Sequence, residues 1–172
     1  EIKAAPVVVD LNDDGIQEII VSFDMGGTFY VKSYSPQLIC TVTGWSPGGS
    51  HTAELLWTYS DSLLMIGSTD GPYVSSTYGG HKPTAQPLLA DLDLDGTAEL
   101  VLSLIEKNSD DPVVLALDIT GTSATSIWQK ILDKGTHPSD PTFIQTDENT
   151  AFILLTSVQS STSAMWVWKL DA

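Results

Sequence analysis

Two acidic segments carry the side chains of this chain that are most able to do chemistry. Each has an oxygen-bearing side chain at its first, third and fifth positions, a glycine at the sixth and a glutamate at the ninth. Alternate spacing within a tight loop turns such oxygens toward one point, and hard oxygen ligands in this number suit Ca²⁺. The predicted side-chain ligands are Asp10, Asn12, Asp14 and Glu18 in the first segment and Asp91, Asp93, Asp95 and Glu99 in the second.

The seventh position of each segment is expected to add a backbone carbonyl, from Ile16 and from Thr97. Magnesium requires a tighter octahedron, and zinc prefers histidine or thiolate ligands. An EF-hand needs a glutamate at the twelfth position and a helix on each side, but Val21 and Leu102 stand at that position here. The ninth-position glutamate is therefore expected to complete each site at the start of an outgoing strand, which predicts two calcium sites in β-hairpins.

Ordinary acidic turns are the alternative interpretation, because Asp, Asn and Gly form turns without any cation. Two copies with every ligand position filled favour calcium over that alternative. The four carboxylates of the second loop would also repel one another without a cation. The first loop has three carboxylates and an amide, so the second loop is expected to bind calcium more tightly.

The acidic loops belong to a longer internal repeat. Residues 6–22 (PVVVDLNDDGIQEIIVS) align with residues 87–103 (PLLADLDLDGTAELVLS), 81 residues further on. Residues 52–71 and 141–158 keep the plan of two apolar runs around a short polar turn but lack the acidic loop. The spacing predicts four units of about 40 residues, about the length of a propeller blade. The approximate blades are 5–45, 46–84, 85–135 and 136–172.

Strand-like runs fill the sequence between these hairpins. They are rich in Val, Thr, Tyr and Trp and are bounded by Gly, Pro, Ser and Asp, as strands are. No window of eleven or more residues sustains a helical apolar stripe. The sequence therefore predicts an all-β chain. The additional runs are Thr28–Tyr34, Leu38–Val42, Pro72–Thr77, Val113–Asp118, Thr125–Ile131 and Ser163–Lys169.

The pattern D-x-[DN]-x-D-G-x-x-E between two apolar strands resembles the FG-GAP/VCBS-type repeat of integrin α-chain propellers and of many secreted or cell-surface proteins. The resemblance is specific at Asp10–Glu18 and at Asp91–Glu99, and it is weaker elsewhere. It implies a β-propeller, or a propeller arc of about four blades, with Ca²⁺ in blades one and three. It also implies an extracellular location, secreted or at the cell surface. Integrin-type loops more often have Asp at the ninth position, where this chain has Glu18 and Glu99.

Composition excludes several classes of function. The chain has 172 residues, 22 of them acidic against 7 basic, and its net charge of −15 without any arginine argues against nucleic acid or an anionic membrane as partner. No run approaches the ~18 apolar residues of a membrane-spanning helix. Cys40 is the single cysteine, so no internal disulfide forms. The sequence begins at Glu1 rather than at a methionine, as expected of a mature product or a piece of a longer polypeptide.

Three loop residues could contact a ligand other than calcium. Trp45 lies in a Gly/Ser/Pro-rich loop, and Tyr78 and His81 lie in a comparable one. Exposed aromatic residues beside small polar ones are typical of carbohydrate sites, although plain anchoring of the loops explains the same pattern. Trp57 and Trp128 are expected in the core. No nucleophile elbow, Cys–His pair or phosphate-binding glycine loop occurs, so no catalytic residue is predicted.

These observations favour a non-enzymatic extracellular calcium-binding module with a structural, adhesion or assembly role through protein contacts. A lectin-like carbohydrate-binding module and an accessory part of a polysaccharide-degrading enzyme are the alternatives. A four-blade ring is within the range of propellers, which have four to eight blades. An unclosed arc would instead expose strand edges that another chain must cover, giving a homo-oligomer or a fibre.

Overall fold

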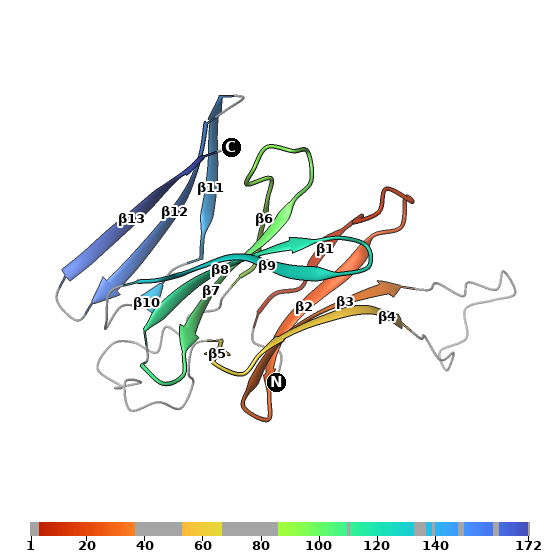
Figure 1. Cartoon of the computed structure of the whole chain (residues 1–172), viewed down its shortest axis with the longest axis horizontal. Helices are drawn as coiled ribbons and strands as arrows, with labels where there is room; N and C mark the ends of the chain where they lie inside the picture. The colour runs from red at the N-terminus through yellow and green to blue at the C-terminus, as the bar shows by residue number, and fades with distance from the viewer. Residues whose placement is uncertain are drawn as a thin grey trace, which may run out of the picture.

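The computed structural model describes residues 4–36, 53–66, 86–109, 111–132, 137–138, 140–147, 150–159 and 162–171. Within these ranges the chain forms thirteen strands and no helix, which confirms the all-β prediction. The same ranges accordingly contain no helix with the length and apolar character needed to cross a membrane. The strands belong to three sheets, here named sheets A, B and C in chain order (Figure 1).

Sheet A is an antiparallel meander whose four strands lie in chain order. Its second and third strands alternate buried and half-buried residues, as expected of a sheet with one face in a core. Gly26 and Gly27 both have positive φ, 60° and 80°, which fits the two-residue hairpin between these strands. The strands are β1 (Val7–Val9), β2 (Glu18–Met25), β3 (Thr28–Pro36) and β4 (Ala53–Asp61).

In sheets B and C, as in sheet A, a shorter strand pairs antiparallel with the long strand that follows it in the chain. In sheet B two short strands, β5 (Leu64–Met65) and β6 (Leu88–Ala90), pair with different stretches of one long strand, and two further strands follow in order. In sheet C two shorter strands again share a long partner, which also pairs with the last strand. The remaining strands are β7 (Glu99–Glu106), β8 (Pro112–Ile119), β9 (Ala124–Ile131), β10 (His137–Pro138), β11 (Thr142–Asp147), β12 (Thr150–Gln159) and β13 (Thr162–Asp171).

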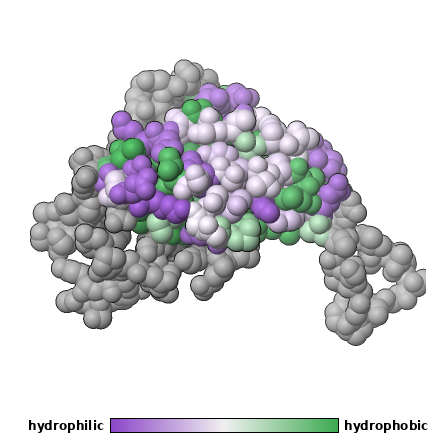
Figure 2. All heavy atoms as spheres, turned by 60° about the horizontal axis from the view of Figure 1, so that its bottom comes forward, coloured by the Kyte–Doolittle hydropathy of each residue, from purple (hydrophilic) through white to green (hydrophobic). Residues whose placement is uncertain are grey.

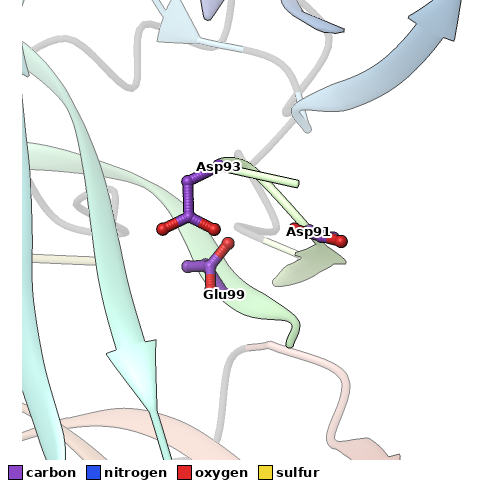
Figure 3. A group of neighbouring side chains, drawn as sticks. All are labelled: Asp91, Asp93 and Glu99. Carbon is purple, nitrogen blue, oxygen red and sulfur yellow. The ribbon is translucent and has the colours of Figure 1, made fainter. Parts of the chain in front are cut away.

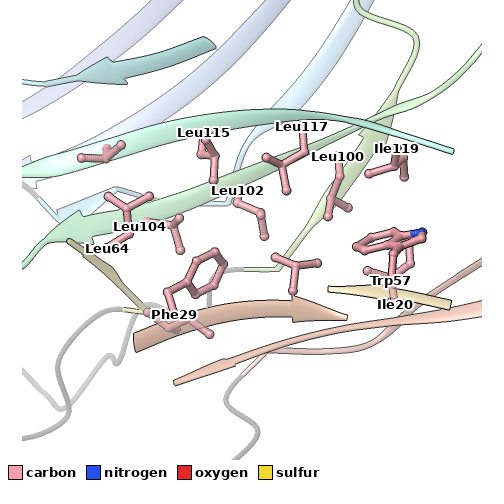
Figure 4. Close-up of a cluster of buried hydrophobic side chains, with 13 residues drawn as sticks. Ile20, Phe29, Trp57, Leu64, Leu100, Leu102, Leu104, Leu115, Leu117 and Ile119 are labelled. Carbon is pink, nitrogen blue, oxygen red and sulfur yellow. The ribbon is translucent and has the colours of Figure 1, made fainter. Parts of the chain in front are cut away.

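Sheet B is the middle layer and is covered on both faces. One face packs against sheet A in a cluster that includes Ile20, Phe29 and Leu102 (Figure 4). The opposite face packs against sheet C in a second cluster that includes Val101 and Ile153. Double burial explains why β7 and β8 are almost continuously apolar rather than alternating.

The structure corrects the predicted division into blades. Residues 53–61, expected in a separate second blade (46–84), form the fourth strand of sheet A instead. Residues 64–65 then add to the edge of sheet B. The polar turn at 60–62 therefore leads from one sheet to the next rather than closing a hairpin. Within the described ranges the chain forms three sheets instead of the four predicted units. The expected strands at 38–42 and 72–77 lie outside the described residues.

The other strand predictions agree with the structure. The runs at 28–34, 113–118, 125–131 and 163–169 fall within β3, β8, β9 and β13. The hairpin predicted at 141–158 is the antiparallel pair β11–β12. The sequence periodicity was sufficient for these elements because each combines a strand-like apolar run with turn residues at both ends.

Sheets A and B are equivalent beyond the aligned loops. Ser33 of β3 pairs with Trp57 of β4, and a register shift follows directly. Ala116 of β8 pairs with Trp128 of β9, again beside a register shift. Trp57 packs in the cluster between sheets A and B, and Trp128 packs against the cluster between sheets B and C. In both sheets the corresponding tryptophan therefore lies on the face that packs on the next sheet in the chain. Sheet A stacks on sheet B through the same face that sheet B uses to stack on sheet C.

We expect Leu102→Ala to destabilise the fold by ~2–5 kcal/mol, because Leu102 is fully buried between sheets A and B and its truncation leaves a cavity. Ile131→Ala on β9 is the matched control, since this side chain is 51% exposed and should change stability by no more than about 0.5 kcal/mol. Urea unfolding of both variants measures the difference. Equal effects of the two substitutions would contradict the stacking.

Candidate metal centre

The two acidic loops have the same backbone conformation. Each connects the short first strand of its sheet to the long second strand, β1 to β2 and β6 to β7. The fourth position is left-handed in both, with φ of 57° at Asp13 and 61° at Leu94. The sixth position is also left-handed, with φ of 84° at Gly15 and 94° at Gly96. A glycine is required there because a Cβ would strain this conformation.

The first-position aspartate is fixed by the turn that it begins. Asp10 accepts hydrogen bonds from the backbone N–H of Asp14 (3.2 Å) and of Gly15 (2.8 Å). In the second loop Asp91 accepts the equivalent bonds from Asp95 (3.1 Å) and Gly96 (3.0 Å). Asp10 also accepts the N–H of Asn12 at 3.4 Å. A carboxylate has about four lone-pair positions, so each aspartate still retains acceptor capacity for a cation.

The ninth-position glutamate lies at the start of the outgoing strand, as the sequence predicted. Glu18 opens β2 and is 1% exposed, and Glu99 opens β7 and is 2% exposed. Each accepts a hydrogen bond from the loop's second residue, Glu18 from Leu11 (2.8 Å) and Glu99 from Leu92 (2.6 Å). A buried carboxylate without partners would be costly, and this bond satisfies one of its oxygens.

The second loop brings three carboxylates together. Oxygens of Asp91, Asp93 and Glu99 all lie within 4.8 Å of one another. The carboxylates of Asp93 and Glu99 face each other, and Asp91 lies to one side of them (Figure 3). Burial raises the pKa of Glu99 and the nearby carboxylates of Asp93 and Asp91 raise it further, although the Leu92 N–H acts in the opposite direction. Accumulated negative charge is thus unfavourable here, and a cation would relieve it. This triad could hold a metal ion.

Asp95, the fifth-position ligand predicted in the second loop, is not part of the triad. Its side chain accepts hydrogen bonds from the hydroxyl and the backbone N–H of Thr97. These two bonds hold the pKa of Asp95 below its ordinary value. Thr97 was predicted to contribute its carbonyl to the metal; in the structure its N–H and its hydroxyl donate to Asp95.

The first loop is arranged around an amide instead of a third-position carboxylate. Asn12 donates from Nδ2 to Asp14 (3.0 Å) and accepts the Asp14 N–H on Oδ1 (3.1 Å). Asp14 also accepts the N–H of Ile16 (2.7 Å), whose side chain is half exposed. The residues predicted to bind metal are therefore adjacent, but within the described ranges this loop does not form a carboxylate triad like that of Asp91, Asp93 and Glu99.

Gly121 lies against the first loop, a contact that was not predicted from the sequence. It lies in the turn between β8 and β9 of sheet B, and a Cβ added there would meet the Cβ of Asn12 at 3.0 Å. The neighbouring Thr120 accepts a hydrogen bond from the indole Nε1 of Trp57 on β4 (2.9 Å). The first loop of sheet A therefore abuts sheet B, a contact between residues more than a hundred positions apart that no local pattern reveals.

Trp45, Tyr78 and His81, predicted as possible ligand contacts, lie outside the described residues. Trp57 is buried as predicted, and Trp128 is half-buried against the second core cluster.

Comparison with known proteins gave no match: no family model matches the sequence, no curated protein matches it, and no solved structure matches the fold.

Exchanging the third-position residues tests the two loops against each other. Asp93→Asn gives the second loop the side-chain set of the first, and Asn12→Asp gives the first loop the carboxylates of the second. We expect the first change to weaken calcium binding at its loop and the second change to strengthen it, because affinity rises with the number of carboxylates. Isothermal titration measures both. An unchanged affinity in both variants would show that these side chains are not ligands.

Gly121→Ala should disturb the first loop alone. The added methyl would press on Asn12 at 3.0 Å, so we expect weaker calcium binding at Asp10–Glu18 and unchanged binding at Asp91–Glu99. The Asn12→Asp and Asp93→Asn proteins assign the two binding events in the titration. If the alanine variant loses affinity at the second loop instead, the assigned contact is wrong.

Proposed function

We propose that this chain is a non-enzymatic calcium-binding β-sheet module of an extracellular protein, with a structural, adhesion or assembly role through protein contacts. The single observation that carries the proposal is the triad of Asp91, Asp93 and the buried Glu99 on a hairpin of the middle sheet. A cation there would join the acidic loop to a strand at the centre of the fold.

Calcium is the cation that these ligands favour. The donor set consists of carboxylate oxygens, whereas zinc sites are usually built from histidine or cysteine. The loop combines a left-handed glycine with alternating oxygen-bearing side chains, a spacing typical of calcium loops. A second site at Asp10–Glu18 is proposed because the two loops share backbone conformation and hydrogen bonds.

A propeller arc is the arrangement that we propose for the sheets. Support comes from the resemblance of both loops to the FG-GAP/VCBS-type repeat and from the stacking of A on B and of B on C through equivalent faces. Repetition of one stacking relation is the basis of propellers. The first two sheets carry the proposed calcium loops.

A structural rather than signalling role follows from the position of the loops. Both connect strands that are fixed in sheets, and Glu18 and Glu99 are already bonded to their loops. Calcium would therefore reinforce a hairpin instead of triggering a large movement. The extracellular location is proposed because modules of this kind bind at ~0.1–1 mM calcium, well above cytosolic levels.

Metal-stripped protein should become more stable when calcium is added and much less so when magnesium is added. Calcium at a hundredfold excess over its dissociation constant stabilises a fold by ~2.7 kcal/mol per site, which raises the melting temperature of a domain of this size by about 5–10 °C. Scanning calorimetry in calcium, magnesium and chelator measures this shift. Identical melting temperatures in all three would contradict the calcium assignment.

A further inference from the structure

Sheet A has an outer face, opposite the core, that is largely apolar. Register places its residues in rows across the strands: Val8 pairs with Ile19 and Ile19 with Tyr34, while Phe23 pairs with Tyr30. Val8 is 52% exposed, and Leu55, which pairs with Tyr34, is similarly exposed. Thr58 and Ser60 of β4, which pair with Lys32 and Tyr30, add two hydroxyls at one side. We call this set the outer face of sheet A: Val8, Ile19, Val21, Phe23, Tyr30, Lys32, Tyr34, Leu55, Thr58 and Ser60.

The equivalent face of sheet B shows what such a surface packs against. The 81-residue repeat aligns Ile19, Val21 and Phe23 of β2 with Leu100, Leu102 and Leu104 of β7. All three leucines are fully buried in the cluster shared with sheet A. In sheet B this face is covered by the preceding sheet, whereas in sheet A it is the outer face.

Two rings on this outer face are already ordered against each other. Phe23 and Tyr30 stack with centroids 5.5 Å apart. The ammonium of Lys32 lies 5.7 Å from the Phe23 ring and 5.8 Å from the Tyr30 ring. Lys32 is the only charged side chain of the face as defined, so little charge would have to be desolvated on docking. The side of the molecule drawn in Figure 2 has small hydrophobic patches among neutral and hydrophilic residues.

Sheet C has the complementary kind of surface at the other end of the stack. Ile153 and Leu155 of β12 are buried against sheet B, so the alternate residues Phe152 and Leu154 belong to the opposite face. Ile144 of β11 pairs with Phe152 and is 43% exposed. This outer face of sheet C points away from sheet B. It corresponds to the face of sheet B that points away from sheet A and packs on sheet C.

We infer that the outer face of sheet A docks on the outer face of sheet C of a second copy of this chain. The contact repeats the stacking already made twice within the chain, A on B and B on C, through equivalent residues. It rests on the assembly role proposed above and specifies the partner. A contact between two different faces is head to tail, so it closes a ring if the rotation fits and otherwise extends into a filament. Two copies would stack six sheets, within the range of closed propellers.

A second copy of this chain is the expected partner, because each copy has both an outer face of sheet A and an outer face of sheet C. The net charge of −15 on each copy opposes association. Among the side chains that the structure describes on the two faces, however, the charged ones are Lys32 of sheet A and Asp147, which pairs with Thr150 at the end of sheet C. Repulsion between the remaining charges is screened over ~8 Å at physiological ionic strength. Association should therefore be stronger at 150 mM salt than at 10 mM.

Light scattering after gel filtration in 150 mM salt and 1 mM calcium tests the inference, with the intact chain at concentrations up to ~100 μM. We expect a mass at least twice the 18.5 kDa of one copy. Val8→Lys and Ile144→Lys should each weaken association at least tenfold. Ile127→Lys on the exposed edge of β9 is the matched control, since Ile127 is 48% exposed and lies on neither outer face.

Mixing the Val8→Lys and Ile144→Lys proteins gives the decisive result. A head-to-tail contact leaves one intact pair of faces in the mixture, so a two-copy particle should reappear. Loss of association in Val8→Lys but not in Ile144→Lys would mean that two A faces meet, which would overturn the inference. A monomeric wild type would overturn it as well and would leave the face for a different protein. Calcium titration of the Val8→Lys protein separates this failure from failure of the proposed calcium function. Calcium binding without association would overturn only the docking, whereas absence of calcium binding would contradict the proposed function itself.

Discussion

The hydrogen bond from the loop backbone to the buried glutamate is the interaction on which the proposed function depends. In both loops a carboxylate that is almost wholly buried accepts the N–H of the loop's second residue, Leu11 or Leu92. This bond fixes the acidic loop against the first residue of a long strand. In the second loop it also holds Glu99 beside Asp91 and Asp93, where burial and like charges make its ionisation unfavourable without a cation.

Sheet stacking converts these local sites into properties of the whole fold. The long strands that begin at Glu18 and Glu99 also carry the apolar residues that join sheets A, B and C. The first loop additionally contacts the turn at Gly121 in the next sheet. Calcium bound at these loops would therefore stabilise both a hairpin and the contact between layers, which is the physical basis for a structural role.

Sequence reasoning predicted the parts of this architecture that are local. Alternating oxygen-bearing residues, a glycine and a ninth-position glutamate were sufficient to place two equivalent loops in hairpins. They did not reveal the hydrogen bonds that Asp95 accepts from Thr97, because those depend on the side-chain geometry of the folded loop. The assignment of residues 53–61 to a second blade was wrong because a strand's partner is decided by packing, here of Trp57 between sheets A and B, and not by its spacing from the next apolar run.

The most direct test of the calcium account is the amide spectrum of isotope-labelled, metal-stripped protein during a calcium titration. The N–H groups of Leu92, Asp95 and Gly96 donate to Glu99 and Asp91, so they report on the carboxylates themselves. The account predicts large, saturable shifts at these three amides and at their counterparts in the first loop, with magnesium much less effective. Weak, non-saturating shifts spread over the acidic surface would contradict it.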